Sequence, residues 1–240
     1  MGVSFFLVSG FVIIHFFSKY ISFPKHIVRR FVSFSAGVGV AYIFIHLWPQ
    51  VAVTQSEAME TFDWLNEHVL QYALYLIALA GLIISYTLDR LIARAHAQDE
   101  KENPDKLDSA LFKSQMGFFA VYNAMIGYLI VQYANTDTNI YIFFIAFALH
   151  FFTNDWGLRH HHESIYDKYG RWLLSGSIIV GYVIALFTDF PDYFIGSVES
   201  FITGAMTLNI IKHELPSERN GNLEGFLVGV VSAAVLFTLL

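Results

Sequence analysis

Residues 34–49 read FSAGVGVAYIFIHLWP, and residues 201–216 read FITGAMTLNIIKHELP. Both stretches are largely apolar for about four helical turns, which is most of the length that a helix needs to cross a bilayer. At an offset of 167 residues, Phe34, Gly37, His46 and Pro49 recur as Phe201, Gly204, His213 and Pro216. The agreement indicates that one structural unit occurs twice in the chain.

The composition of the whole chain points to lipid as its surroundings. Of the 240 residues, 55% are hydrophobic and only 14% are charged, and the mean hydropathy is +0.51. This apolar content exceeds what the core of one globular domain buries. The sequence contains no cysteine, which excludes disulfides, thiolate metal sites and a cysteine nucleophile.

Eight segments are long and apolar enough to be transmembrane helices. They cover about residues 2–18, 31–51, 68–89, 113–134, 139–158, 171–188, 192–211 and 222–240. All 14 Lys and Arg residues fall in, or at the edge of, the first, third, fifth and seventh connections. Because Lys and Arg collect on the cytoplasmic side of short loops, this alternation predicts eight spans with both termini on the non-cytoplasmic side.

The two related stretches lie on the second and seventh predicted spans. These spans are five apart and therefore cross the membrane in opposite directions, which is the pattern of an inverted repeat. We predict an all-α integral membrane protein with a single transmembrane domain over residues 1–240 and a 3+2+3 arrangement of helices. Its repeat halves cover about residues 1–89 and 171–240, its central helices about 113–158, and a polar cytoplasmic loop about 90–112.

Polar side chains inside the central spans are candidate functional residues, because each is costly in a bilayer unless it has a partner. Asn123 lies in the fourth span, and His150, Asn154 and Asp155 lie in the fifth. His150 and Asn154 are four residues apart, so they share one face of the helix and can reach one cation. The alternative for each is a hydrogen bond that joins two helices.

Further candidates lie nearer the two membrane surfaces. Glu199 lies in the outer third of the seventh span, and His46 ends the second span on the same side. A cluster in the predicted cytoplasmic loop after the fifth span consists of His160, His161, His162 and Glu163. Together with the central residues these groups line a candidate path for a cation, and their oxygen and imidazole ligands suit zinc, manganese or iron. The alternative for the loop cluster is loose metal binding without a specific role.

The second span resembles the signature of the ZIP (Zrt/Irt-like) metal transporters, a helix of small residues that ends in His-Leu-x-Pro. The segment GAMTLNIIKHELPSE and the glycine-rich last span are similar to the seventh and eighth helices of that family. The resemblance implies eight spans, outward termini and metal transport. At the centre Asn123 and His150 match the family motifs, but Tyr122, Ile126 and Asn154 replace family ligands and the sixth span has no acid. The resemblance therefore implies a weakened central site.

Three functions are compatible with these residues. The first is a ZIP-like transporter of a divalent cation of the zinc, manganese or iron class. The second is a ZIP-fold protein without transport that acts as a regulatory or assembly partner, which the missing acids favour. The third is an intramembrane metal-dependent hydrolase, which would need about three strong ligands and an activated water. We expect the first, and no enzyme.

The first hypothesis also sets the expected surroundings. We expect a multi-pass protein of the plasma (inner) membrane that contacts the lipid bilayer and a metal cation and has no nucleic-acid partner. Zinc or another divalent metal is expected as the substrate, with no organic cofactor. A homodimer is left open by the sequence.

Overall fold

The computed structural model describes residues 2–20, 24–61, 67–99, 104–135, 140–215 and 221–239. Over this part of the chain the structure is helical and contains no strand. The helices in chain order are α1 (Gly2–Phe17), α2 (Lys25–Tyr42), α3 (Trp48–Thr61), α4 (Glu67–Leu70), α5 (Ala73–Asp99), α6 (Pro104–Asn135), α7 (Ile140–Ile165), α8 (Arg171–Phe187), α9 (Asp192–Asn209) and α10 (Leu223–Leu239). A 3-10 turn, η1 (Ser18–Tyr20), follows α1, and three π-helical segments, η2 (Ile43–Leu47), η3 (Tyr166–Gly170) and η4 (Ile210–Glu214), follow α2, α7 and α9.

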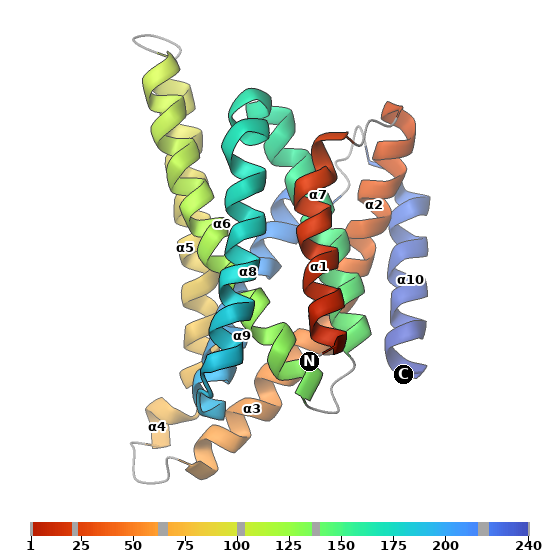
Figure 1. Cartoon of the computed structure of the whole chain (residues 1–240). Coiled ribbons are helices and arrows are strands. Elements are labelled where there is room, and N and C mark those ends of the chain that lie inside the picture. The colour runs from red at the N-terminus through yellow and green to blue at the C-terminus, as the bar shows by residue number, and fades with distance from the viewer. Residues whose placement is uncertain are drawn as a thin grey trace.

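The long helices form one bundle (Figure 1). Within the described residues, six helical segments are long and apolar enough to cross a membrane, and each overlaps one of the predicted spans. They are Gly2–Tyr20, His26–Thr61, Ala73–Arg94, Lys113–Asn135, Glu163–Phe187 and Asp192–Lys212. Helix α7 and the shorter apolar helix α10 run beside them in the same bundle. The chain is thus an all-α protein with the helices of a multi-pass membrane protein.

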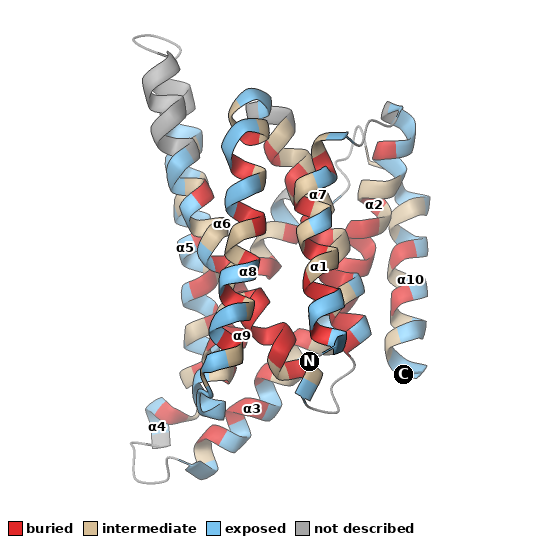
Figure 2. Ribbon diagram, viewed as in Figure 1, coloured by how far each residue is buried: buried red, intermediate tan, exposed pale blue. Residues whose placement is uncertain are grey.

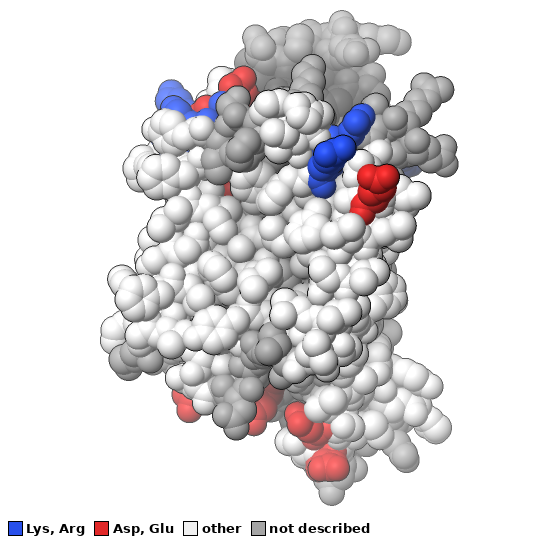
Figure 3. Space-filling model, turned by 90° about the vertical axis from the view of Figure 1, so that its right-hand side faces the viewer, with Lys and Arg blue, Asp and Glu red and all other residues white. Residues whose placement is uncertain are grey.

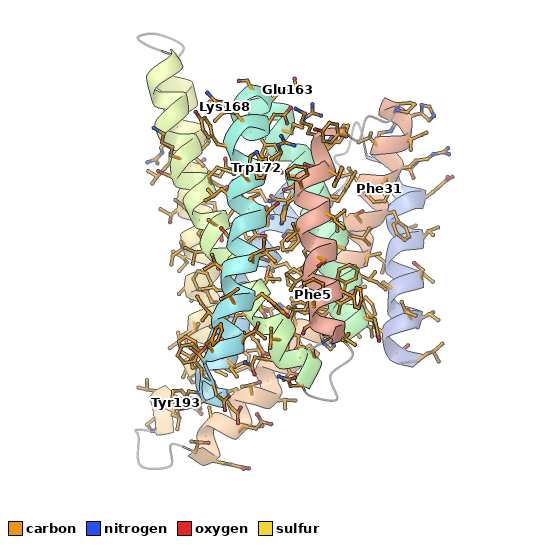
Figure 4. The ribbon with its side chains drawn as sticks, in the orientation of Figure 1. Phe5, Phe31, Glu163, Lys168, Trp172 and Tyr193 are labelled. Carbon is orange, nitrogen blue, oxygen red and sulfur yellow. The ribbon has the colours of Figure 1, made fainter. Side chains whose placement is uncertain are left out.

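The surface of the bundle has the polarity that a bilayer requires. Apolar side chains such as Val180 and Leu227 are exposed on its outside, whereas buried residues face its interior (Figure 2). The exposed aromatic residues Trp172 and Tyr193 lie toward opposite ends of the bundle (Figure 4), where such rings anchor a helix at the membrane surface. The lipid-facing surface is therefore a broad apolar band with aromatic residues near its edges.

Charge is distributed unevenly between the two ends of the bundle. Both chain termini lie at one end (Figure 1). On the face drawn in Figure 3, the described Lys and Arg side chains gather near the other end, while acidic side chains occur at both. We call the end that carries the Lys and Arg residues the basic end. This separation agrees with the alternation of cations along the sequence.

Reciprocal glycine contacts hold α2 against α10 and α5 against α9. A Cβ at Gly37 would collide with the carbonyl oxygen of Phe226, and one at Gly229 would collide with that of Phe34. In the same way, the carbonyl oxygen of Ala78 blocks a Cβ at Gly204, and that of Phe201 blocks one at Gly81. Phe34 and Gly37 are separated from Phe201 and Gly204 by the same 167 residues as the rest of the motif. Small residues at such crossings let helix backbones approach closely in a membrane.

The two π-helical segments η2 and η4 are also separated by 167 residues. Pro49 explains the first of them. Its ring would clash with the carbonyl of Ile45, four residues earlier, and it donates no backbone hydrogen bond, so a wider turn before it relieves the clash. His46 lies in η2, and the backbone of His213 occupies the equivalent position in η4. Pro216, the partner of Pro49 in the motif, lies outside the described residues.

The predicted polar loop at about 90–112 is largely helical. Helix α5 continues to Asp99, and α6 begins at Pro104, so only residues 100–103 of that segment lie outside the description. Proline suits the start of a helix because the first turn needs no backbone donor there. The first residues of the loop predicted after the fifth span are helical too, because residues 160–163 belong to α7. A run of charged residues predicts a loop, but a helix can also continue beyond the membrane with charged residues on its surface.

We predict that Gly204→Ala and Gly37→Ala each lower the free energy of unfolding by about 1–3 kcal/mol, because the new methyl group must push two backbones apart. Gly176→Ala is the matched control, since a Cβ there meets nothing within 4 Å. The control should gain up to about 1 kcal/mol from its better helix propensity. Thermal unfolding in detergent measures both. Equal effects at all three positions would show that these glycines do not set the helix spacing.

Candidate functional site

A buried hydrogen-bonded network joins three helices near the basic end. His15 of α1 lies between Asp155 of α7 and Asn123 of α6, and all three side chains are at most 1% exposed. The distance from His15 Nδ1 to Asp155 Oδ2 is 2.8 Å, and that from His15 Nε2 to Asn123 Oδ1 is also 2.8 Å. His15 precedes Lys19 by one helical turn, so the network lies about 6 Å inside the basic end of α1.

The neighbours of His15 fix the hydrogen bonds of the network. The Asn123 side-chain amide donates to the backbone carbonyl of Phe119 at 2.7 Å, which fixes its Oδ1 toward His15. With the amide turned over, two oxygens would face each other at Phe119. Nε2 of His15 therefore donates to Asn123 Oδ1, and one proton is shared between Nδ1 and the Asp155 carboxyl group. The His15–Asp155 pair is buried and has no net charge, whichever of the two atoms holds that proton.

The Asp155 carboxylate is only half satisfied. Its Oδ2 accepts from His15, but its Oδ1 has no hydrogen-bond partner among the described residues although Asp155 is fully buried. The Tyr166 hydroxyl interacts electrostatically with this carboxylate, without the geometry of a hydrogen bond to Oδ1, and lies 3.4 Å from Ser18 Oγ. A buried carboxylate oxygen without a donor is costly, so this atom can accept a further ligand.

A second polar cluster lies on another face of α7. His150 is 2% exposed, and its Nε2 lies 3.5 Å from the Asn209 side-chain amide of α9. Its ring also meets that of Tyr122 edge-on, with 6.2 Å between centroids. His150 and Asp155 are five residues apart, about 140° around the helix, so they face different neighbours. Asn123 and His150, which we expected to share one site, therefore have different partners.

A small cavity lies between α5, α6 and α9 beside this second cluster. It has a volume of about 20 Å³, which is room for about one water. Its polar lining residues are Ser85, Asp89, Gln115, Tyr122 and Asn209. Asp89 forms an ion pair of 2.9 Å with Lys212 of η4. The rest of its lining is apolar, so the cavity is a small gap with a few polar groups among apolar side chains.

Aromatic rings fill the bundle between His15 and the end that carries the termini. Phe143, Phe147 and Phe151 follow one another at four-residue spacing on α7, and none is more than 1% exposed. Their successive ring centroids are 4.6 and 6.0 Å apart, and the Phe151 ring lies 4.6 Å from that of His15. Phe11 packs edge-on against Phe151 at 5.0 Å. This column leaves an apolar barrier on one side of the network.

Two of the predicted outer residues lie beyond that barrier. Glu199 is 7% exposed on α9 and forms a hydrogen bond with the Tyr133 hydroxyl of α6. His46 stacks on the Tyr42 ring with 5.1 Å between centroids. Tyr42 also interacts electrostatically with Glu199, so the two predicted residues belong to one neighbourhood. They do not contact the His15 network through any described interaction.

The remaining predicted residues are Asn154, at the centre, and the four of the loop cluster. Asn154 is half-buried without a described partner, and Glu163 pairs with Arg159 at 2.8 Å. The side chains of His160, His161 and His162 lie outside the described residues. Within the described part of the chain, no group of three or more His, Asp and Glu side chains could hold a metal ion. Any cation at the centre would therefore need the Asn123 amide oxygen as a further ligand.

Sequence reasoning missed His15 and Asn209. A signal for His15 was present, because it is the only ionisable side chain among the first 18 residues and is costly in a bilayer without a partner. Asn209 lies at the offset of 167 from Tyr42, directly before the π-helical segment of the second motif.

Comparison of the chain with protein-family profiles, with curated proteins and with solved structures found no match.

Proposed function

We propose that this protein is a membrane transporter of a small divalent cation, of the zinc, manganese or iron class, and a divergent relative of the ZIP transporters. The observation that carries the proposal is the convergence of His15, Asn123 and Asp155 from three helices on one buried point. An imidazole nitrogen, an amide oxygen and a carboxylate are ligand types that these metals accept. The unpartnered Oδ1 of Asp155 adds a fourth donor atom at the same point.

The proposal assigns each end of the bundle a different role. The small cavity lined by Asp89 and Asn209 would belong to the route on the basic side, and the phenylalanine column of α7 would close the other side. With the basic end in the cytoplasm, the bundle would be closed to the outside and accessible from within. Glu199, beyond the column, would supply negative charge at the outer entrance.

We further propose the eight-span topology with both termini outside and a 3+2+3 inverted repeat. In this arrangement α7 and α10 complete the six longer spans. The repeat would relate α2 to α9 and α5 to α10, which is supported by the equivalent glycine contacts and by π-helical segments at the same offset. Inverted repeats allow a transporter to open alternately to each side, and the wide turns at His46 and His213 are suitable points of bending.

A ZIP-fold protein without transport is the second candidate. It is favoured by the hydrogen bonds of His15, because both ring nitrogens already have partners, Asp155 and Asn123, without a cation. In that case the ion pair would only fix three helices in register. An intramembrane hydrolase is less well supported, because the described residues include no cluster of three His, Asp and Glu side chains.

Uptake into proteoliposomes tests the proposal directly. The unmodified protein should carry at least one of Zn, Mn, Fe, Co, Ni and Cd above the rate of protein-free liposomes. A fluorescent metal indicator inside the liposomes would follow each ion. If none of the six ions enters, although the protein is folded and correctly inserted, the transport proposal fails and the assembly function is favoured.

A further inference from the structure

An open groove lies between α2 and α10 at the basic end of the bundle. Its volume is about 600 Å³, in the range of sites that hold a small organic ligand. Helix α2 extends beyond the first turn of α10 here (Figure 1), so the described residues of α10 do not cover the end of α2. At Gly225 a Cβ would lie 3.0 Å from the carbonyl oxygen of Arg30, so the first turn of α10 packs closely against α2 below the opening.

The groove is cationic at its rim and apolar along its wall. His26 and Arg30 line the rim, are exposed, and have no ion-pair or hydrogen-bond partner among the described residues. The apolar wall is formed by Ile27, Phe31, Phe34 and Val228. The Phe31 ring lies on this wall close to the basic end (Figure 4). Such an apolar wall at the edge of a membrane is better covered by an acyl chain than by water.

The end of α10 adds polar donors to the same place. Asn222 lines the groove, and its Oδ1 accepts from the backbone N–H of Gly225 at 2.6 Å, so its amide group is left to donate. The 17-residue helix α10 also points its positive end at the groove. One group opposes an anion there, because the exposed Glu224 carboxylate also lines the groove.

We infer that this groove binds one anionic phospholipid of the leaflet at the basic end, with its phosphate between Arg30, His26 and the Asn222 amide and an acyl chain along Phe31 and Val228. Basic pockets between transmembrane helices bind anionic headgroups in this manner. The apolar wall favours a lipid over a free phosphate, because a free phosphate would leave it exposed to water. This inference is independent of the transported ion.

Native mass spectrometry of the detergent-purified protein, titrated with phosphatidylglycerol, tests the inference. Arg30→Gln should weaken binding of the first lipid about fivefold, which is the effect of one cation at a membrane surface. Arg29→Gln is the matched control, since Arg29 is the neighbouring exposed arginine and does not line the groove. Glu224→Gln should strengthen binding, and Val228→Trp should weaken it by filling the apolar part without changing charge.

Two comparisons distinguish the lipid from other ligands. Phosphatidylcholine should bind more weakly than phosphatidylglycerol, and glycerol phosphate should not displace the bound lipid. If Arg29→Gln and Arg30→Gln weaken lipid binding equally, the binding reflects a general attraction between the basic surface and anionic lipid, which would overturn the inference. Displacement by glycerol phosphate, or unchanged binding by Val228→Trp, would show a phosphate site without a lipid chain and would overturn it as well.

Discussion

Asp155→Asn should reduce metal uptake to the level of protein-free liposomes. Asp155 is the only carboxylate in the His15 network, and the neutral amide keeps one oxygen but loses the second oxygen and the negative charge. A divalent cation gives up much hydration on entering the bundle, and neutral ligands compensate this poorly. Glu199→Gln should reduce uptake less, because Glu199 is hydrogen-bonded near the outer end and does not touch the network. Initial rates of metal entry into proteoliposomes measure both effects.

Glu60→Gln is the control for this series. It makes the same chemical change in an exposed carboxylate of α3 that belongs to none of the candidate sites, and it should leave uptake unchanged. His160→Ala should also have a smaller effect than Asp155→Asn. If Asp155→Asn transports normally while His160→Ala fails, transport depends on the histidines at the end of α7 and the central site is wrong.

Breaking the buried ion pair should have the second large effect, this time on stability. His15→Phe leaves the Asp155 carboxyl group buried without its partner, and Asp155→Leu does the same to the His15 ring. Removing one member of a buried pair costs about 3–5 kcal/mol, whereas replacing both by apolar residues is often nearly neutral. The double variant should therefore be more stable than either single variant. Thermal unfolding in detergent, analysed as a double-mutant cycle, measures the coupling free energy.

His46→Phe provides the comparison for His15→Phe. It replaces another histidine of a membrane-spanning helix by the same residue, but His46 is only partly buried and stacks on Tyr42 without an ion pair in the described structure. Its effect should stay below about 1 kcal/mol. If the two single changes at His15 and Asp155 simply add in the double variant, the two side chains are not coupled and the buried pair does not stabilise the bundle.

The amino-acid sequence alone determined the class of the protein and much of its plan. Apolar runs as long as a bilayer is thick predict membrane helices, because in lipid a helix is the one simple segment that satisfies its own backbone. Six of the predicted spans are matched by long apolar helices. The close contacts at Gly37 and Gly204 and two π-helical segments fall within the motif at an offset of 167 residues, since these features depend on local residues such as glycine and proline.

Only the tertiary structure decided which polar residues meet. Helical spacing placed His150 and Asn154 on one face of α7, but spacing within one helix cannot say which neighbouring helix that face contacts. The structure instead turns Asp155 toward His15 of α1, 140 residues earlier in the chain, and turns His150 toward Asn209 of α9. Partner choice of this kind depends on the order and rotation of packed helices, which are set by many contacts between distant segments. The hydrogen bond at Nε2 of His15 follows from those contacts as well, because it is the Phe119 carbonyl that orients Asn123 and so places an acceptor beside the ring.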